Sequence, residues 1–122
     1  LGSMRLANFP YDGSIYTIVS NSAGELIVAG LRGNAFRSAD QGETWTAVNL
    51  PTSASVVDSI RLGDGRILLA TQTGQLLLSK DGGHSFEDLQ IYHLFPVSAI
   101  AEGRQGEVVV VGLGGVRVLK LN

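Results

Sequence analysis

The sequence contains no cysteine, which excludes disulfides, thiolate metal sites and cysteine nucleophiles. Charged residues make up only 16% of the 122 residues, the net charge is −2, and the nine Lys and Arg are scattered along the chain. Because nucleic-acid binding needs a clustered basic face, no nucleic-acid partner is expected. No apolar run approaches the roughly 20 residues of a membrane helix, so we expect a soluble chain without membrane insertion.

The overall composition is typical of one folded domain with many turns. Apolar residues make up 44% of the chain, which argues against disorder, and there are 16 glycines. Residues 1–3 (LGS) resemble the remnant of a cleaved expression tag, so the protein's own sequence is expected to begin at Met4. The compartment stays open, and a periplasmic or secreted location with the signal peptide already removed is one alternative.

The chain repeats itself with a period of 41 residues. Three segments align without a gap, namely "GELIVAGLRGNAFRSAD", "GRILLATQTGQLLLSKD" and "GEVVVVGLGGVRVLKLN". Each repeat contains short runs of β-branched and aliphatic residues bounded by Gly, Asn, Asp and Ser, which is typical of strands. The predicted strands are 15–20, 25–29, 35–38 and 44–49, then 56–62, 66–70, 75–79 and 85–90, and finally 97–101, 107–111 and 116–120.

Units of about 40 residues with four strands each are typical of β-propeller blades. The predicted fold is therefore all-β, with three four-stranded antiparallel blades in a half-propeller or a fragment of a larger one. The segment "LANFP" (6–10) matches "AVNLP" (47–51) at the same offset, so we predict an orphan fourth strand at 4–10. The domain layout is this strand, a blade at 14–51, a blade at 55–92, and the first three strands of a blade at 97–121.

Three blades are too few to close a ring, and their terminal faces would be apolar. One hypothesis is a homodimer in which the orphan strand completes the last blade of a second copy, giving a six-bladed ring. The alternative is a longer parent propeller cut between blades.

The stretch "SADQGETW" (38–45) recurs in weaker form as "SKDGGHSF" (79–86). It resembles the Asp box of BNR-type propellers, which include sialidases, sortilin-like receptors and some glycoside hydrolases. The flanking sequence is most similar to photosystem II assembly-factor-like proteins, and this resemblance implies a role in assembling or stabilising larger complexes. The box residues are Ser38, Asp40, Gly42, Thr44, Trp45, Ser79, Asp81, Gly83, Ser85 and Phe86.

We interpret the box as a brace of its own hairpin. A short Asp side chain can accept hydrogen bonds from the backbone of its own turn, and the hydroxyl of Thr44 or Ser85 can add another. Gly42 and Gly83 allow a positive φ, and Trp45 and Phe86 are expected to bury a ring between neighbouring sheets. Calcium would need more carboxylates at alternating positions, so we expect no metal and no other cofactor.

No catalytic residue is predicted. A sialidase needs several arginines for its substrate, but the repeat equivalents of Arg32 are Thr73 and Gly114. The two histidines, His84 and His93, lie on different predicted loops and lack metal-ligand spacing. The glycines of "GLGG" (112–115) recur as an ordinary turn, "GLRG", in the first repeat.

The face opposite the boxes is the candidate binding face, because loops that differ between repeats carry function more often than the conserved core positions do. Three hypotheses stay open: a non-catalytic scaffold for protein interaction or complex assembly, a glycan-binding or glycoside hydrolase propeller with its catalytic residues elsewhere, and a repeat with no function beyond folding. The candidate binding residues are Tyr11, Asp12, Arg32, Asn34, Gln72, Thr73, Tyr92 and His93.

Overall fold

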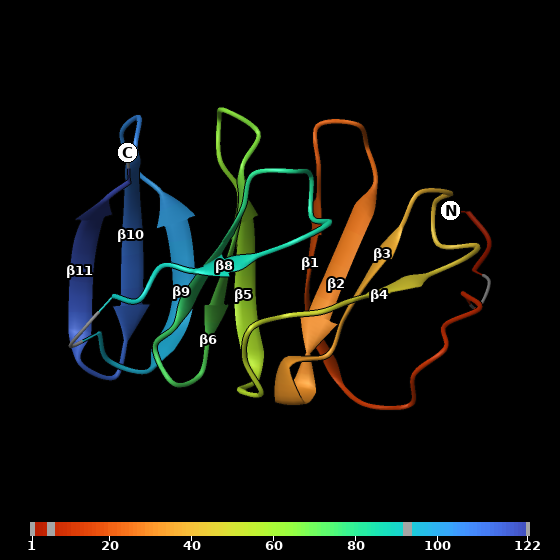
Figure 1. Cartoon of the computed structure of the whole chain (residues 1–122), viewed down its shortest axis with the longest axis horizontal. Helices are drawn as coiled ribbons and strands as arrows, with labels where there is room; N and C mark the ends of the chain where they lie inside the picture. Colours follow the sequence, from red (N-terminus) through yellow and green to blue (C-terminus); the bar gives the residue numbers. More distant parts are fainter. Residues whose placement is uncertain (1, 5–6, 92–93, 122) are drawn as a thin grey trace.

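A computed structural model describes residues 2–4, 7–91 and 94–121, and in it three antiparallel sheets stand side by side (Figure 1). Sheet 1 contains β1 (Ile15–Ser20), β2 (Leu26–Gly30), β3 (Ala35–Ser38) and β4 (Thr46–Val48). Sheet 2 contains β5 (Val56–Arg61), β6 (Ile67–Thr71), β7 (Leu76–Ser79) and β8 (Glu87–Asp88). Sheet 3 contains β9 (Val97–Glu102), β10 (Glu107–Gly112) and β11 (Gly115–Lys120).

This architecture confirms the predicted blades. The first three strands of each sheet begin and end within one residue of the prediction. The fourth strands, β4 and β8, are shorter than predicted, because the residues before them are bonded into the box turns described below. A single turn of 3-10 helix, η1 (Leu31–Gly33), joins β2 to β3.

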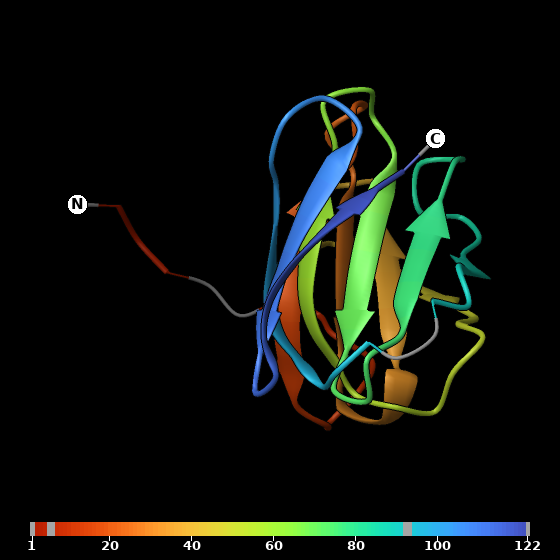
Figure 2. The same ribbon diagram turned by 90° about the vertical axis from the view of Figure 1, so that its left-hand side faces the viewer.

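The sheets stack face to face and bury two apolar layers between them (Figure 2). Strand β6 is buried on both sides, as the unbroken apolar sequence predicts. Ile67 and Leu69 belong to the layer shared with sheet 1, whereas Leu68 and Ala70 belong to the layer shared with sheet 3. Burying each such leucine or isoleucine contributes about 1.5–3 kcal/mol, so these layers hold neighbouring sheets together.

The turns fall on two opposite faces. The lower face carries η1 and the β6–β7 and β10–β11 turns, and it lies at the bottom of Figure 1. The upper face carries the β1–β2, β5–β6 and β9–β10 turns together with the two box hairpins. The strands β1, β5 and β9 lie next to one another along one side of the stack.

The third hairpin departs from the repeat although its sequence aligns without a gap. In sheet 2 Leu68 pairs with Leu78, so the repeat would pair Val109 with Leu119. The structure instead pairs Val109 with Val118, because Leu113 and Gly114 alone form the turn between Gly112 and Gly115. A slip of one residue turns the side chains of β11 to the opposite faces of the sheet.

The predicted strand at 4–10 does not form in the described residues 4 and 7–10. A strand needs a partner edge, and the prediction assigns to it the last blade of a second copy. The corresponding edge of the same chain, β11, lies at the other end of the stack (Figure 1). The segment around Phe9 instead lies on sheet 1, with its ring 5.0 Å from that of Phe36 and 5.1 Å from that of Trp45, both edge-on.

Candidate functional site

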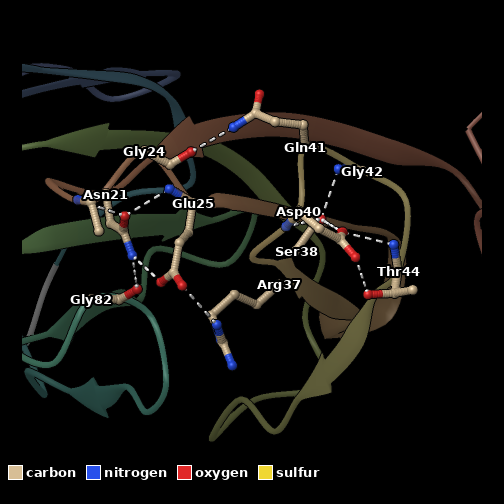
Figure 3. Close-up of polar contacts among 11 residues, drawn as sticks. Asn21, Gly24, Glu25, Arg37, Ser38, Asp40, Gln41, Gly42, Thr44 and Gly82 are labelled. Atoms are coloured by element: carbon tan, nitrogen blue, oxygen red, sulfur yellow. Dashed lines mark hydrogen bonds and ion pairs between the residues drawn. The ribbon is translucent and has the colours of Figure 1, made fainter.

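The first box hairpin is braced by two side chains, those of Ser38 and Asp40 (Figure 3). The buried Ser38 hydroxyl donates to Asp40 Oδ1 at 2.9 Å and accepts from the backbone N–H of Gly42 at 2.8 Å. Asp40 in turn accepts from the backbone N–H of Thr44 at 2.8 Å and from its hydroxyl at 2.5 Å. Both carboxylate oxygens are thus bonded to the hairpin that carries them.

The second box repeats this arrangement atom for atom. Ser79 donates to Asp81 Oδ1 at 2.8 Å and accepts from the N–H of Gly83 at 2.8 Å. Asp81 accepts from the N–H of Ser85 at 2.9 Å and from its hydroxyl at 2.5 Å. These bonds from Ser85 favour the carboxylate and lower the pKa of Asp81 from 3.8 to about 2. The pKa of Asp40 is lowered in the same way by the hydroxyl and N–H of Thr44.

The two box aromatics have different surroundings, which corrects the expectation that both lie between sheets. Phe86 packs against the apolar layer between sheets 1 and 2. Trp45 belongs to the first sheet, and within the described residues Phe9, not a further sheet, packs on its ring. Its indole N–H donates to the carbonyl of Gly42 at 3.0 Å.

A buried asparagine that sequence reasoning missed ties the two four-stranded sheets together on the upper face (Figure 3). Asn21 donates from Nδ2 to the carbonyl of Gly82 at 2.9 Å and to Glu25 Oε1 at 2.8 Å. Its Oδ1 accepts from the backbone N–H groups of Ala23 and Glu25. The one signal in the sequence is that this position differs in every repeat, with Asn21, Leu62 and Gly103 as equivalents.

The predicted binding residues that the structure describes lie on the lower face, and only some of them are in contact with one another. Asn34 donates to the Tyr11 hydroxyl at 3.0 Å. Arg32 is exposed, with a φ of 58°, and its N–H donates to Ser55 Oγ. Asp12 is exposed and follows Tyr11 in the sequence. Tyr92 and His93 lie outside the described residues.

Gln72 and Thr73 occupy the β6–β7 turn, where their roles differ. The Thr73 hydroxyl lies 3.4 Å from Gln75 Oε1, which also accepts from Thr52 at 2.5 Å. Gln75 Nε2 donates to Asp88 Oδ2 at 3.1 Å, so this cluster holds the lower end of sheet 2 together. Gln72 is exposed, and its side chain reaches a groove that the sequence did not reveal.

This groove has a volume of about 470 Å³ and lies where the lower ends of β1, β5 and β9 meet. The strand pairing skips one residue at the same place in each sheet, and the skipped residues are Tyr16, Val57 and Ser98. Such β-bulges re-aim a side chain away from the regular alternation. All three skipped side chains line the groove together with Gln72 and Val97.

A signal for these residues exists in the repeat alignment. Positions 16, 57 and 98 carry Tyr, Val and Ser, directly after a position that carries Ile, Val and Val. The alternation of apolar and polar residues predicts a strand but does not show where a bulge interrupts it. Alternation alone would therefore place the side chains at positions 16, 57 and 98 on the wrong face of their sheets.

The described residues contain no group of three or more His, Asp or Glu that could hold a metal ion. Within the same ranges there is also no helix with the length and apolar character of a membrane span.

Two solved propellers have a similar structure. Virginiamycin B lyase from Staphylococcus aureus superposes with a TM-score of 0.73 at 14% identity, over 99% of this chain and 46% of its own. YCF48 bound to D1 peptide superposes with a TM-score of 0.69 at 18% identity, over 95% of this chain and 39% of its own. This chain has the fold of a partial β-propeller.

The same lyase in a catalytically inactive form with quinupristin superposes equally well, with a TM-score of 0.73 at 15% identity over 99% of this chain and 46% of that one. The chain thus spans less than half the length of these propellers. No protein-family model and no curated protein matches it. At this level of identity the likeness shows the propeller scaffold and not an activity, since one neighbour is a lyase and another is bound to a peptide.

Proposed function

We propose that this partial propeller is a non-catalytic interaction module that binds an extended segment of a partner protein in the lower groove. The observation that carries the proposal is the groove built by the three bulges, because each sheet contributes one bulged residue and the groove lies across all three sheets. A site that crosses several blades suits an elongated ligand better than a small one.

The chemistry of the lining favours a peptide over a glycan. Tyr16 is 51% exposed and offers an aromatic ring, while Val57 adds apolar surface. Gln72 and Ser98 supply hydrogen-bonding groups that can pair with a peptide backbone. Tyrosine is among the residues that carry most binding energy in protein interfaces. An acidic or sugar-acid ligand would need arginines, and the residues lining the groove include none.

The same lining supports a role without catalysis. The hydroxyls of Tyr16 and Ser98 are its only candidate nucleophiles, and none of the lining residues is a His, Asp, Glu or Lys that could activate them. The neighbour that is bound to a peptide is a further point of support for a binding role.

The test selects binders from a phage-displayed library of random linear peptides and measures the selected peptides by fluorescence polarisation. We expect Tyr16→Ser to weaken binding at least about tenfold, the loss of one hot-spot side chain. Leu113→Ser is the matched control, because Leu113 is 92% exposed but lies outside the groove.

Selected peptides that bind Tyr16→Ser and wild type equally would place the interaction elsewhere and overturn the proposal. An array of immobilised oligosaccharides is the second arm. If no peptide is selected and the protein binds the array only when Tyr16 is present, the ligand is a glycan and not a protein segment.

A further inference from the structure

Each of the two terminal sheets has an apolar outer face that no other sheet of the described residues covers. On sheet 1, Phe9 and Tyr11 cover part of this face by packing on Phe36. On sheet 3, Val116 and Val118 are 65% and 58% exposed, and they stand opposite Val111 and Val109 on the same face. That face points away from sheet 2, because Val108 and Val110, on the alternate side of β10, belong to the buried layer.

On sheet 1 the corresponding outward row runs across all four strands. Ile18, which is 59% exposed, pairs with Val28, which pairs with Phe36, which pairs with Ala47. None of these four belongs to the layer that sheet 1 shares with sheet 2. Of the six large apolar side chains that are most exposed in the described residues, three (Ile18, Val116 and Val118) therefore lie on the two terminal faces.

Each face contains a position whose repeat equivalent is buried elsewhere in the same chain. Val109 is the repeat equivalent of Leu68, which is fully buried against sheet 3. Phe36 is the equivalent of Leu77, which is fully buried against sheet 1. Val118 is not one of these positions, because the slip of β11 turns it outward whereas its equivalent, Leu77, faces sheet 1. Val109 and Phe36 thus lie at the two ends of the stack in positions that the repeat buries between neighbouring sheets.

The segment at 7–11 already lies where such a packing needs it. Leu50 follows β4 and packs against the layer that also contacts Phe86. Its repeat equivalent is Phe9, which packs against Trp45, the equivalent of Phe86. The N-terminal segment therefore lies on sheet 1 as the fourth strand of a preceding sheet would, and sheet 3 is the sheet that has only three strands.

From this geometry we infer that two copies of the chain associate head to tail, with the outer face of sheet 3 of one copy on the outer face of sheet 1 of the other. The segment 7–10 of each copy then reaches the free edge of β11 in its partner and pairs with it. The contact is made twice and closes a ring of six sheets with two-fold symmetry. This inference goes beyond the proposed peptide groove and does not depend on it.

Sedimentation velocity at micromolar concentration tests the assembly on the chain as it stands. We expect a species of twice 12.9 kDa. Val118→Lys and Ile18→Lys should each abolish this dimer, because each places a charge on one of the two faces. Both side chains are largely exposed in the single chain, so circular dichroism should show that the variants still fold. Ser53→Lys adds the same charge on an exposed loop and should leave the dimer intact.

Mixing the two lysine variants distinguishes the geometry. The Val118→Lys variant keeps a wild-type face on sheet 1, and the Ile18→Lys variant keeps a wild-type face on sheet 3. These two faces can still pack on each other, so we expect the mixture to regain dimers. A monomeric wild type overturns the inference, and so does a dimer that survives Ile18→Lys, since this would mean that sheet 3 faces pair with each other. Open-ended higher oligomers would overturn ring closure.

Discussion

Asn21 in sheet 1 donates its side-chain amide to the carbonyl of Gly82 in sheet 2 at 2.9 Å, across 61 positions of sequence. The side-chain oxygen of Asn21 also holds its own turn by accepting from the backbone N–H groups of Ala23 and Glu25. The backbone carbonyl of Asn21 accepts from the side chain of Arg61 at 3.0 Å. One buried side chain thus couples the shape of a turn in one blade to the position of the box in the next.

Replacing Asn21 should reveal this coupling. Asn21→Ala removes the part-buried hydrogen bonds that join two turns and should lower the free energy of unfolding by about 1–3 kcal/mol. Asn21→Asp keeps the acceptor for Ala23 and Glu25 but directs a carboxylate at the carbonyl of Gly82 and the side chain of Glu25. It should therefore cost more than Asn21→Ala at neutral pH.

Urea denaturation of both variants measures these changes. Acidification should reduce the excess cost of Asn21→Asp as its carboxylate takes up a proton. Equal stability of the two variants at pH 7 would mean that the bond to Gly82 contributes little.

The depressed pKa of Asp81 predicts how the fold responds to acid. The folded value of about 2 lies below the ordinary 3.8, so the unfolded chain binds a proton first as the pH falls. The contribution of Asp81 to stability is complete above pH 3.8 and is lost as the pH falls from 3.8 to about 2. Thermal unfolding of wild type should show a falling Tm in this window.

Asp81→Asn removes the titrating group and should flatten the Tm curve in the same window, while lowering Tm at neutral pH. Asp40 retains its own depressed pKa in this variant, so some slope should remain. Parallel curves for the two proteins would contradict the bonding of Asp81 to Ser85.

The two box glycines offer a matched pair of substitutions. Gly42 and Gly83 have φ values of +91° and +93°, so alanine should cost about 1–2 kcal/mol of backbone strain at either position. A Cβ on Gly83 would also come within 2.6 Å of Ile27 Cγ1 in the neighbouring sheet, whereas on Gly42 its nearest contact is Trp45 at 3.5 Å.

Gly83→Ala should therefore be more destabilising than Gly42→Ala by a further 1–3 kcal/mol or so, the usual cost of overpacking. Chemical denaturation in dilute solution, where association does not contribute, measures both. Equal losses in the free energy of unfolding would show that the interface between sheets 1 and 2 rearranges to make room for the added methyl group at residue 83.

Local patterns in the sequence account for much of what the structure contains. The 41-residue period, the strands and the chemistry of both boxes depend on contacts within a few residues, such as Asp81 with Ser85. Hydrogen bonds over such short separations are repeated wherever the same residues recur, so they can be predicted from one chain.

Tertiary structure decided the remainder. The bulges that aim Tyr16, Val57 and Ser98 into one groove follow from strand pairing and the approach of neighbouring sheets, not from the alternation of residues. The place of Phe9 depends on its contacts with the rings of Phe36 and Trp45. Each of these outcomes is a choice between arrangements with similar local energies, and only packing against residues distant in sequence separates them.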